Sequence, residues 1–327
     1  MDPESHTSTP APSAGETQTA ISRPNNRRNA VLAVLAAALL WSTSYVVTKV
    51  GVSDVPPLTF GVLRFTFASL LVAVLALARR QVQPVPPRDL LRLAAGGLLG
   101  ITAYFALQNL GMQRTSASEA TLLVASFPAI TMLMEVIFLK RRVPLLRFAG
   151  AGIAFLGIFL VIQQTENGGG TQRLQGDLLL LATGVAWALY NFATQNVVQR
   201  YTTFTVIFWQ TLFGSLFFLP LALLEAGSWQ PLSASGLWGA LYLGIFCSVA
   251  AFLLYGFGLK SLNPGAAVSL LNLVPVFGLL LAVIGLHEAV TGLQLLGGAV
   301  VIGGVTLSVQ ERPPTDTQPA GNRKAGR

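Results

Sequence analysis

The sequence has little charge. Only 10% of its 327 residues are Asp, Glu, Lys or Arg, whereas an ordinary soluble domain carries about 25%. The hydrophobic fraction is 53% and the mean hydropathy is +0.62. A soluble fold of this size cannot hide so much apolar surface beneath a charged exterior. The composition therefore excludes a disordered chain and most water-soluble enzymes, and it predicts a protein surrounded largely by lipid.

Residues that bind metals or catalyse reactions are also scarce. Cys247 is the single cysteine, and His6 and His287 are the two histidines. These numbers exclude an internal disulfide and make a thiolate or multi-histidine metal centre an unsuitable interpretation. The sequence has no GxxxxGK(S/T), HExxH or GxSxG motif and no cluster of acids for a metal. We expect no cofactor, no metal and no enzymatic activity.

Long apolar runs make up most of what is present. A helix needs about 20 mostly apolar residues to cross a bilayer. Runs such as AVLAVLAAALL are apolar on every face and lack the alternation of a transmembrane β-strand. The predicted fold is an all-α integral membrane protein with ten transmembrane helices: Asn29–Val50, Leu58–Ala78, Leu90–Leu110, Ala117–Leu139, Leu146–Ile162, Gly176–Val198, Thr202–Leu224, Ser235–Leu259, Gly265–Leu286 and Val290–Val309.

The net charge of +8 follows a topological pattern. With the N-terminus in the cytoplasm, 17 of the 21 Lys and Arg residues fall on cytoplasmic segments and three on external ones, as the positive-inside rule requires. Both termini are then cytoplasmic, in a multi-pass protein of the plasma or inner membrane. Residues 1–28 and 311–327 are polar and are predicted to be disordered tails. Because topology accounts for the excess charge, we expect no nucleic-acid partner.

The second half of the sequence repeats the first. Trp41 corresponds to Trp187 and Arg64 to Gln210 at a spacing of 146 residues, and Pro128 corresponds to Pro275 at a spacing of 147. The predicted organisation is five helices in residues 29–163, an external linker at 164–175, and five helices in residues 176–310. Because five is odd, the second repeat is inverted in the membrane. Inverted repeats are typical of transporters, whose substrate site lies near the midplane between the halves.

A set of segments, in order, resembles a known family. WSTSYVVTKV in the first span, LRF in the second, TSASEATLLVASFPAI in the fourth and LHEAVTGLQLLGGAVVIGGV in the last two are similar to the EamA-type permeases of the drug/metabolite transporter superfamily. The resemblance covers about Val31–Val309 in two copies. It implies a ten-helix permease that moves small metabolites such as amino acids. The family often has Gly-Glu at the ends of the fourth and ninth spans, whereas this sequence has Lys140-Arg141 and His287-Glu288.

Arg64 is the most informative single residue. It lies well inside the second span, where a charge costs at least about 2.5–3.5 kcal/mol. One interpretation is a cation that faces a cavity and binds the carboxylate of a solute. The other is a structural arginine that ties neighbouring helices together through backbone carbonyls. Gln210, at the equivalent position, keeps polarity without charge.

Polar and aromatic side chains form stripes on several spans. Such a face suits a pocket for a small amphipathic solute, although the same residue types also hold membrane helices together. The predicted substrate-binding residues are Trp41, Ser44, Tyr45, Arg64, Tyr104, Gln108, Trp187, Tyr190, Asn191, Gln210 and Tyr255. We expect the first, third, sixth and eighth spans to line the cavity, with contributions from the second and seventh.

The remaining polar and special residues have a structural interpretation beside the functional one. Ser116 and Glu119 fit a capping box, with a proton-carrying role for Glu119 as the alternative. Asp177 is expected at a helix start. Pro128 and Pro275 are predicted mid-helix kinks or gates. The glycines expected at close helix contacts are Gly96, Gly100, Gly150, Gly157, Gly297 and Gly304.

The predicted function is therefore secondary transport. The sequence favours a permease that moves a small solute across the bilayer by alternating access, with export favoured over import. The expected state is a monomer or a weak homodimer. An integral-membrane enzyme and a channel are the alternatives. An enzyme would need the catalytic motifs that are missing, and inverted repeats within one chain favour alternating access over a channel.

Overall fold

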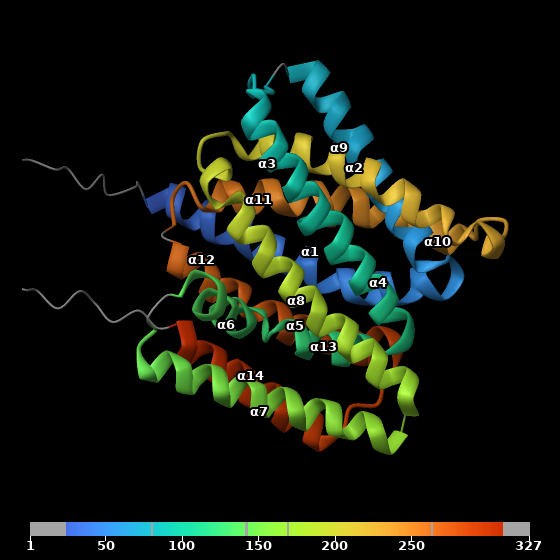
Figure 1. Cartoon of the computed structure of the whole chain (residues 1–327), viewed down its shortest axis with the longest axis vertical. Helices are drawn as coiled ribbons and strands as arrows, with labels where there is room; N and C mark the ends of the chain where they lie inside the picture. The colour runs from blue at the N-terminus through green and yellow to red at the C-terminus, as the bar shows by residue number, and fades with distance from the viewer. Residues whose placement is uncertain (1–23, 80, 141–142, 169, 263, 310–327) are drawn as a thin grey trace, which may run out of the picture.

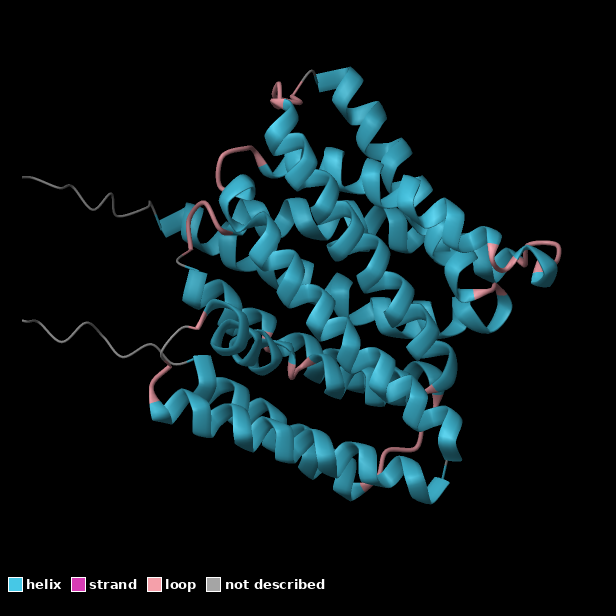
Figure 2. Cartoon of the chain, viewed as in Figure 1, coloured by secondary structure: helices cyan, strands magenta, loops and turns pink. Residues whose placement is uncertain are grey.

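The structure is a computed structural model that describes residues 24–79, 81–140, 143–168, 170–262 and 264–309. These residues form helices joined by short connections, with no strand among them (Figure 2). The elements are α1 (Pro24–Asp54), α2 (Pro57–Arg79), α3 (Pro87–Gly97), η1 (Leu98–Ala103), α4 (Tyr104–Arg114), α5 (Ala117–Val124), α6 (Phe127–Leu139), α7 (Leu145–Gly168), α8 (Gly170–Val198), α9 (Thr203–Leu223), η2 (Ala226–Ser228), α10 (Ala234–Tyr242), η3 (Leu243–Ala250), α11 (Ala251–Gly258), α12 (Pro264–Leu271), α13 (Leu273–Leu286) and α14 (Gly292–Val309). The predicted all-helical fold is confirmed for this part of the chain.

Seven helical runs within the described residues are long and apolar enough to cross a membrane. They are 27–54, 57–78, 87–114, 145–163, 170–198, 203–223 and 234–258. The pair α5 and α6 makes an eighth if it is counted as one span bent by 43°. The helices α13 and α14 are apolar but shorter. Every predicted span thus coincides with helix, although length and composition identify fewer than ten.

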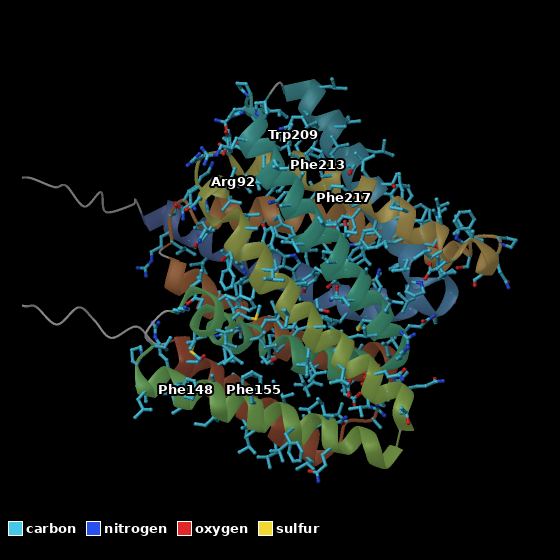
Figure 3. All side chains as sticks on the ribbon, viewed as in Figure 1. Arg92, Phe148, Phe155, Trp209, Phe213 and Phe217 are labelled. Carbon is cyan, nitrogen blue, oxygen red and sulfur yellow. The ribbon has the colours of Figure 1, made fainter. Side chains whose placement is uncertain are left out.

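The exterior of the bundle is apolar, as lipid requires. Leu77 is 81% exposed and Ile284 is 69% exposed. Along α9, Trp209, Phe213 and Phe217 stack in a row at ring-centroid distances of 5.8 and 6.3 Å (Figure 3). A helix in lipid must satisfy its own backbone hydrogen bonds, and aliphatic and Phe side chains such as these add no polar group to it.

Equivalent residues of the two repeats contact one another reciprocally. The hydroxyls of Ser69 and Ser215, which are 146 residues apart, lie 2.9 Å from each other. Equivalent residues that touch lie close to the axis that relates the two repeats. The helix ends also match, because Lys140 and His287, 147 residues apart, both close their helices with a positive φ, of 49° and 53°.

The helices α7 and α14 pack side by side along one flank of the bundle (Figure 1). Their glycines permit backbone contact: a Cβ on Gly150 would lie 2.7 Å from the carbonyl oxygen of Gly304, and one on Gly157 would lie 2.7 Å from that of Gly297. Gly150 corresponds to Gly297 and Gly157 to Gly304, so this contact is reciprocal too. Gly96 and Gly100 instead make room for side chains, because a Cβ on either would lie 2.5 Å from the side chain of Gln210 or Tyr190, respectively. The prediction that these six glycines mark close helix contacts is confirmed.

Four details differ from the sequence-based expectation. The predicted linker 164–175 is helical where described, because α7 continues to Gly168 and α8 begins at Gly170. Asp177 therefore lies two turns inside α8 and not at a helix start. Pro128 and Pro275 are not mid-helix residues: they fall in the first turns of α6 and α13, just after breaks in the fourth and ninth predicted spans. A first turn has unbonded N–H groups and tolerates proline. Of the predicted tails, residues 24–28 are helical, and 1–23 and 310–327 lie outside the described residues.

Candidate functional site

Arg64 lies on α2 and is 3% exposed. Its Nε donates to the hydroxyl of Ser248 on η3 at 2.9 Å, and its guanidinium carbon lies 4.2 Å from the centroid of the Phe105 ring on α4. Among the described residues, Ser248 is its one hydrogen-bond partner and no carboxylate lies within 4.0 Å. The structure therefore holds a buried positive charge in place by one hydroxyl and a π-face.

Three elements, α1, α4 and α11, bring other predicted residues close to this charge. Tyr45 on α1 and Tyr104 on α4 lie within electrostatic range of Arg64. The indole Nε1 of Trp41 donates to the carbonyl oxygen of Cys247 on η3 at 3.1 Å. The Trp41 ring contacts Tyr255 on α11 at a centroid distance of 5.7 Å. The first, second, third and eighth predicted spans thus converge around Cys247 and Ser248.

A second group of aromatic residues adjoins the first, which consists of Trp41, Tyr45, Tyr104 and Tyr255. The Tyr104 ring lies 5.8 Å from Trp187 on α8, and Trp187 lies 5.1 Å from Tyr190. The Tyr190 hydroxyl donates to Oε1 of Gln210 on α9 at 3.3 Å. The two groups share Tyr104, so the predicted aromatic residues of both repeats form one surface.

Three buried amides, those of Gln108, Asn109 and Gln210, retain unused hydrogen-bonding capacity. Nε2 of Gln210 and Oε1 of Gln108 are buried, and neither has a hydrogen-bond partner among the described residues. Buried polar atoms in proteins are almost always paired, and an exception requires an explanation. Nε2 of Gln210, beside Tyr190, is therefore available to a polar solute at this surface.

Two segments of π-helix frame the site. They are η1 and η3, and they occupy equivalent places in the two repeats. A Cβ on Gly97 would lie 2.8 Å from the carbonyl oxygen of Gln210, and one on Gly244 would lie 2.6 Å from that of Arg64. Gly97, directly before η1, and Gly244, in η3, therefore lie against the backbone of Gln210 and Arg64, which are equivalent residues of the two repeats. Such segments are frequent at functional sites.

An open pocket adjoins the second aromatic group. It has a volume of about 350 Å³ and is lined by Thr131, Glu135, Tyr190, Asn191, Phe192, Thr194, Gln195, Val198 and Gln199. It lies between α6 and α8, towards the end of α8 and away from the α7–α8 connection. Its volume is at the lower end of the range of small-molecule sites.

Not every predicted residue takes part in the cluster. The Ser44 hydroxyl donates to the carbonyl oxygen of Trp41 at 2.6 Å, and Nδ2 of Asn191 donates to that of Trp187 at 2.9 Å. Both polar groups are thus bonded within their own helices. Phe105, Cys247 and Ser248 belong to the site but were not predicted. Ser248 and Phe105 lie in apolar runs whose sequence carries no sign of their contact with Arg64.

The capping prediction for Ser116 and Glu119 is confirmed in one of its two bonds. The Ser116 hydroxyl accepts from the backbone N–H of Glu119 at 3.1 Å. The Glu119 carboxylate is fully buried, and it accepts from Arg173 and Gln294. A reciprocal capping box, not predicted from the sequence, occurs at Thr291 and Gln294 at the start of α14.

Comparison with known proteins identifies the family to which this chain is similar. The profile of the EamA-like transporter family matches residues 28–163 and 174–310. The chain is 30% identical over 280 residues to a probable terminal-alkyne amino-acid exporter of Streptantibioticus cattleyicolor, covering 85% of this chain and 92% of that protein. It is 27% identical over 296 residues to a probable amino-acid metabolite efflux pump of Escherichia coli, covering 87% and 95%.

A solved crystal structure has the same fold. It matches this chain with a TM-score of 0.60 at 24% sequence identity, and the match covers 85% of this chain and 97% of the other. The two profile matches divide the chain into two repeats, as the internal spacing predicts. The protein is a multi-pass membrane transporter, and the chain belongs to the EamA-like transporter family.

Proposed function

We propose that the protein exports a small carboxylate-bearing metabolite, such as an amino acid or a related amphipathic solute, across the cytoplasmic membrane. The observation that carries the proposal is Arg64, a buried cation with no carboxylate partner among the described residues. Its planar guanidinium matches a carboxylate in two parallel hydrogen bonds. The names of two relatives, an amino-acid exporter and an amino-acid metabolite efflux pump, support the same solute class and direction.

We further propose ten spans in two inverted five-helix repeats, with both termini in the cytoplasm and transport by alternating access. The reciprocal contacts of Ser69 with Ser215 and of α7 with α14 support a two-fold relation between the repeats. In this arrangement the pocket beside Tyr190 opens to the cytoplasm, and the site around Arg64 lies near the midplane. The predicted binding residues Trp41, Tyr45, Tyr104, Trp187 and Gln210 surround the solute.

Counterflow in proteoliposomes tests the proposal. Vesicles containing the purified protein and a high internal concentration of an unlabelled amino acid should accumulate the labelled amino acid transiently. A panel of amino acids and of the matching amines, which lack the carboxylate, identifies the solute. An amine transported as well as its amino acid would contradict the role of the carboxylate. A channel would show no trans-stimulation, and an enzyme would convert the solute.

A further inference from the structure

A pocket lined by basic side chains lies at the other end of α8 from the Tyr190 pocket. It has a volume of about 330 Å³, and we call it the Lys49 pocket. Its lining comes from the ends of α1 and α4, the start of α8 and the connections before α5 and α14: Lys49, Arg114, Thr115, Ser116, Arg173, Glu288 and Ala289. Three cations and one carboxylate therefore line one open cavity.

Backbone carbonyls position two of these cations. The ammonium of Lys49 donates to the carbonyl oxygens of Met112 and Thr115 at the end of α4, at 2.8 and 2.5 Å. The Arg114 guanidinium donates to the carbonyl oxygen of Leu110 at 2.8 Å. An ammonium has three N–H donors and a guanidinium has five. Both side chains thus retain donors that no group among the described residues accepts.

The carboxylate of the lining is bound by a helix start. Glu288 accepts from the backbone N–H groups of Ala117 and Ser118, both at 2.8 Å, and from the Ser118 hydroxyl at 2.6 Å. The first N–H groups of a helix lack partners within the helix and attract negative charge. The charge of Glu288 is therefore met by α5.

Two further acids lie behind the lining. Glu119 and Asp177 are fully buried, and Glu119 pairs with Arg173 at 2.5 Å. Among the residues that the structure describes, no carboxylate lies within 4.0 Å of Lys49 or Arg114. These two cations thus face the pocket without an ion-pair partner in that part of the chain.

The symmetry of the repeats does not require these cations. Lys49 corresponds to Gln195 at a spacing of 146 residues, and Arg114 corresponds to Ser261 at a spacing of 147. Gln195 lines the Tyr190 pocket, so the two pockets occupy equivalent places at opposite ends of the molecule. Packing that is common to both repeats therefore does not explain the charges, and charges in membrane helices call for a function.

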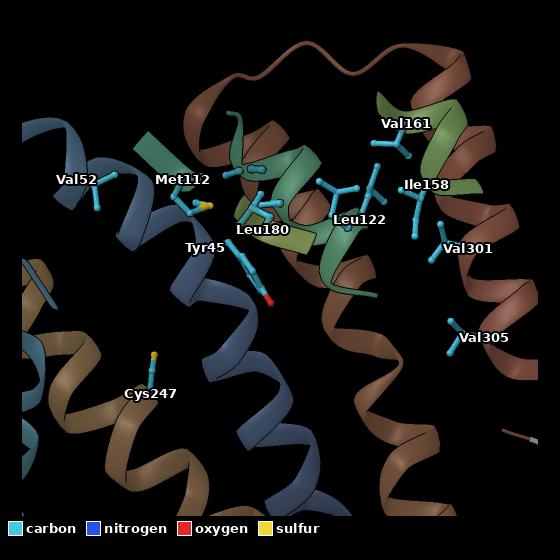
Figure 4. Close-up of a cluster of buried hydrophobic side chains, with 14 of the residues drawn as sticks. Tyr45, Val52, Met112, Leu122, Ile158, Val161, Leu180, Cys247, Val301 and Val305 are labelled. Atoms are coloured by element: carbon cyan, nitrogen blue, oxygen red, sulfur yellow. The ribbon is translucent and has the colours of Figure 1, made fainter. Parts of the chain in front are cut away.

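One face of α1 connects the Lys49 pocket with the Arg64 site. Trp41, Tyr45 and Lys49 are spaced four residues apart and lie on the same face of the helix. Tyr45 is within electrostatic range of Arg64. It also belongs, with Met112, to the buried core beside the pocket (Figure 4). A solute that leaves Arg64 along this face reaches Lys49.

We propose, building on the proposed function, that the Lys49 pocket is a second carboxylate-binding site, which the solute occupies after it leaves Arg64. On the proposed topology this site is external. Arg114 supplies a planar fork that fits a carboxylate, and Lys49 supplies a compact charge. Water in the open pocket weakens both attractions. The outer site therefore binds more weakly than the buried one, and the solute leaves it readily.

Chemical modification inside the pocket measures this binding without transport. Ala289 lines the pocket and is exposed. The purified full-length Ala289→Cys variant is labelled with an anionic and with a neutral methanethiosulfonate reagent, and the ratio of the two rates cancels the reactivity of the thiol itself. Cys247 is fully buried and stays in place, and the wild type gives the background.

A small carboxylate should protect the new thiol. Acetate at about 100 mM should slow labelling by the neutral reagent about twofold relative to chloride at the same ionic strength, as expected for weak binding. Chloride has the charge of acetate but not the two oxygens that match the Arg114 fork. The comparison therefore separates a carboxylate site from a general positive field.

Charge variants test the two cations. In the Ala289→Cys protein, Arg114→Gln should lower the ratio of the anionic to the neutral rate about threefold, because one unit charge is removed several ångströms away in water. It should also abolish protection by acetate. Arg114→Lys should keep the ratio and weaken the protection, because it keeps the charge and loses the fork. Lys49→Gln should lower the ratio too, and it provides the test if Arg114→Gln fails to fold.

Ser228→Cys is the matched control. Ser228 is exposed in η2, just after α9, and lies outside the pocket. Neither Arg114→Gln nor the exchange of chloride for acetate should change its labelling. Equal protection of Ala289→Cys by acetate and chloride would overturn the proposal. A ratio that responds to neither Arg114→Gln nor Lys49→Gln would also overturn it.

The same chemistry binds the solute or another carboxylate from the external solution, and transport separates the two sources. In right-side-out vesicles, Arg114→Gln should raise the half-saturating concentration of the amino acid supplied outside about threefold and leave that of the amino acid supplied inside unchanged. No change on either side, with protection by acetate intact, would show that the solute does not pass through the pocket. Absence of counterflow with protection intact would reject the proposed function and keep a carboxylate site.

Discussion

At the scale of single residues, the proposed binding of a carboxylate solute depends on Arg64. Arg64→Gln removes the charge, and Arg64→Lys keeps the charge but loses the planar fork. A charge-assisted hydrogen bond contributes about 1.5–3 kcal/mol, so Arg64→Gln should weaken the apparent affinity for a carboxylate solute by about 10- to 100-fold. Arg64→Lys should weaken it less. Counterflow over a range of solute concentrations measures both.

The control for Arg64 is Arg92→Gln, which removes a partly exposed arginine that pairs with Asp89 on its own helix. This variant should transport normally. Full activity of Arg64→Gln on every transported solute would make Arg64 a structural residue. Failure of Arg64→Gln, but not of Arg92→Gln, to accumulate in the membrane would favour the interpretation that Arg64 ties helices together.

The sequence identified a residue that is energetically unfavourable in its local environment. It did not identify residues whose role depends on contacts with distant parts of the chain. Arg64 stands out because a charge inside an apolar run needs an explanation wherever the run folds. Its partner Ser248 is 184 residues away and gives no local signal. For Glu119 the local capping pattern is present, but the ion pair with Arg173 comes from a segment predicted to be a polar linker. Local rules cannot anticipate such tertiary partners.

At the scale of helices, the glycines of the α7–α14 pair should be sensitive to substitution by position. A Cβ on Gly304 would lie 2.4 Å from the backbone nitrogen of Ala154, whereas one on Gly303 would meet nothing within 4 Å. Overpacking costs about 1–3 kcal/mol. Gly304→Val should therefore lower the melting temperature of the purified protein by several degrees, and Gly303→Val should leave it nearly unchanged. Equal melting temperatures would show that α7 and α14 do not pack through their glycines.

Helix positions were predictable, but irregularities within them were not. Apolar runs place each predicted span on a helix because lipid leaves the backbone no alternative. The π-segments η1 and η3 change which carbonyl each N–H reaches without changing composition, so they leave no mark in the sequence. Pro128 indicates that the helix is disturbed nearby. The sequence does not say whether the proline lies within a kinked helix or in the first turn of a new one, where proline is tolerated.

At the scale of the whole molecule, the two ends of the bundle should be chemically distinguishable from either side of the membrane. The described residues place α1's start and α14's end on the same side of the molecule, on the left of Figure 1. The charge pattern assigns that side to the cytoplasm. Gln172, exposed near the start of α8, should then be external, and Gln81, exposed in the α2–α3 connection, should be cytoplasmic.

Cysteine labelling in intact cells tests this topology. In a Cys247→Ala background, Gln172→Cys should react with a membrane-impermeant maleimide in intact cells. Gln81→Cys should react only after lysis, and it serves as the control for membrane integrity. The reverse labelling pattern would show that the protein has the opposite orientation in the membrane. The Tyr190 pocket would then open to the outside, where an importer takes up its solute. The sidedness of these two positions therefore determines whether the structure represents a step of export or of import.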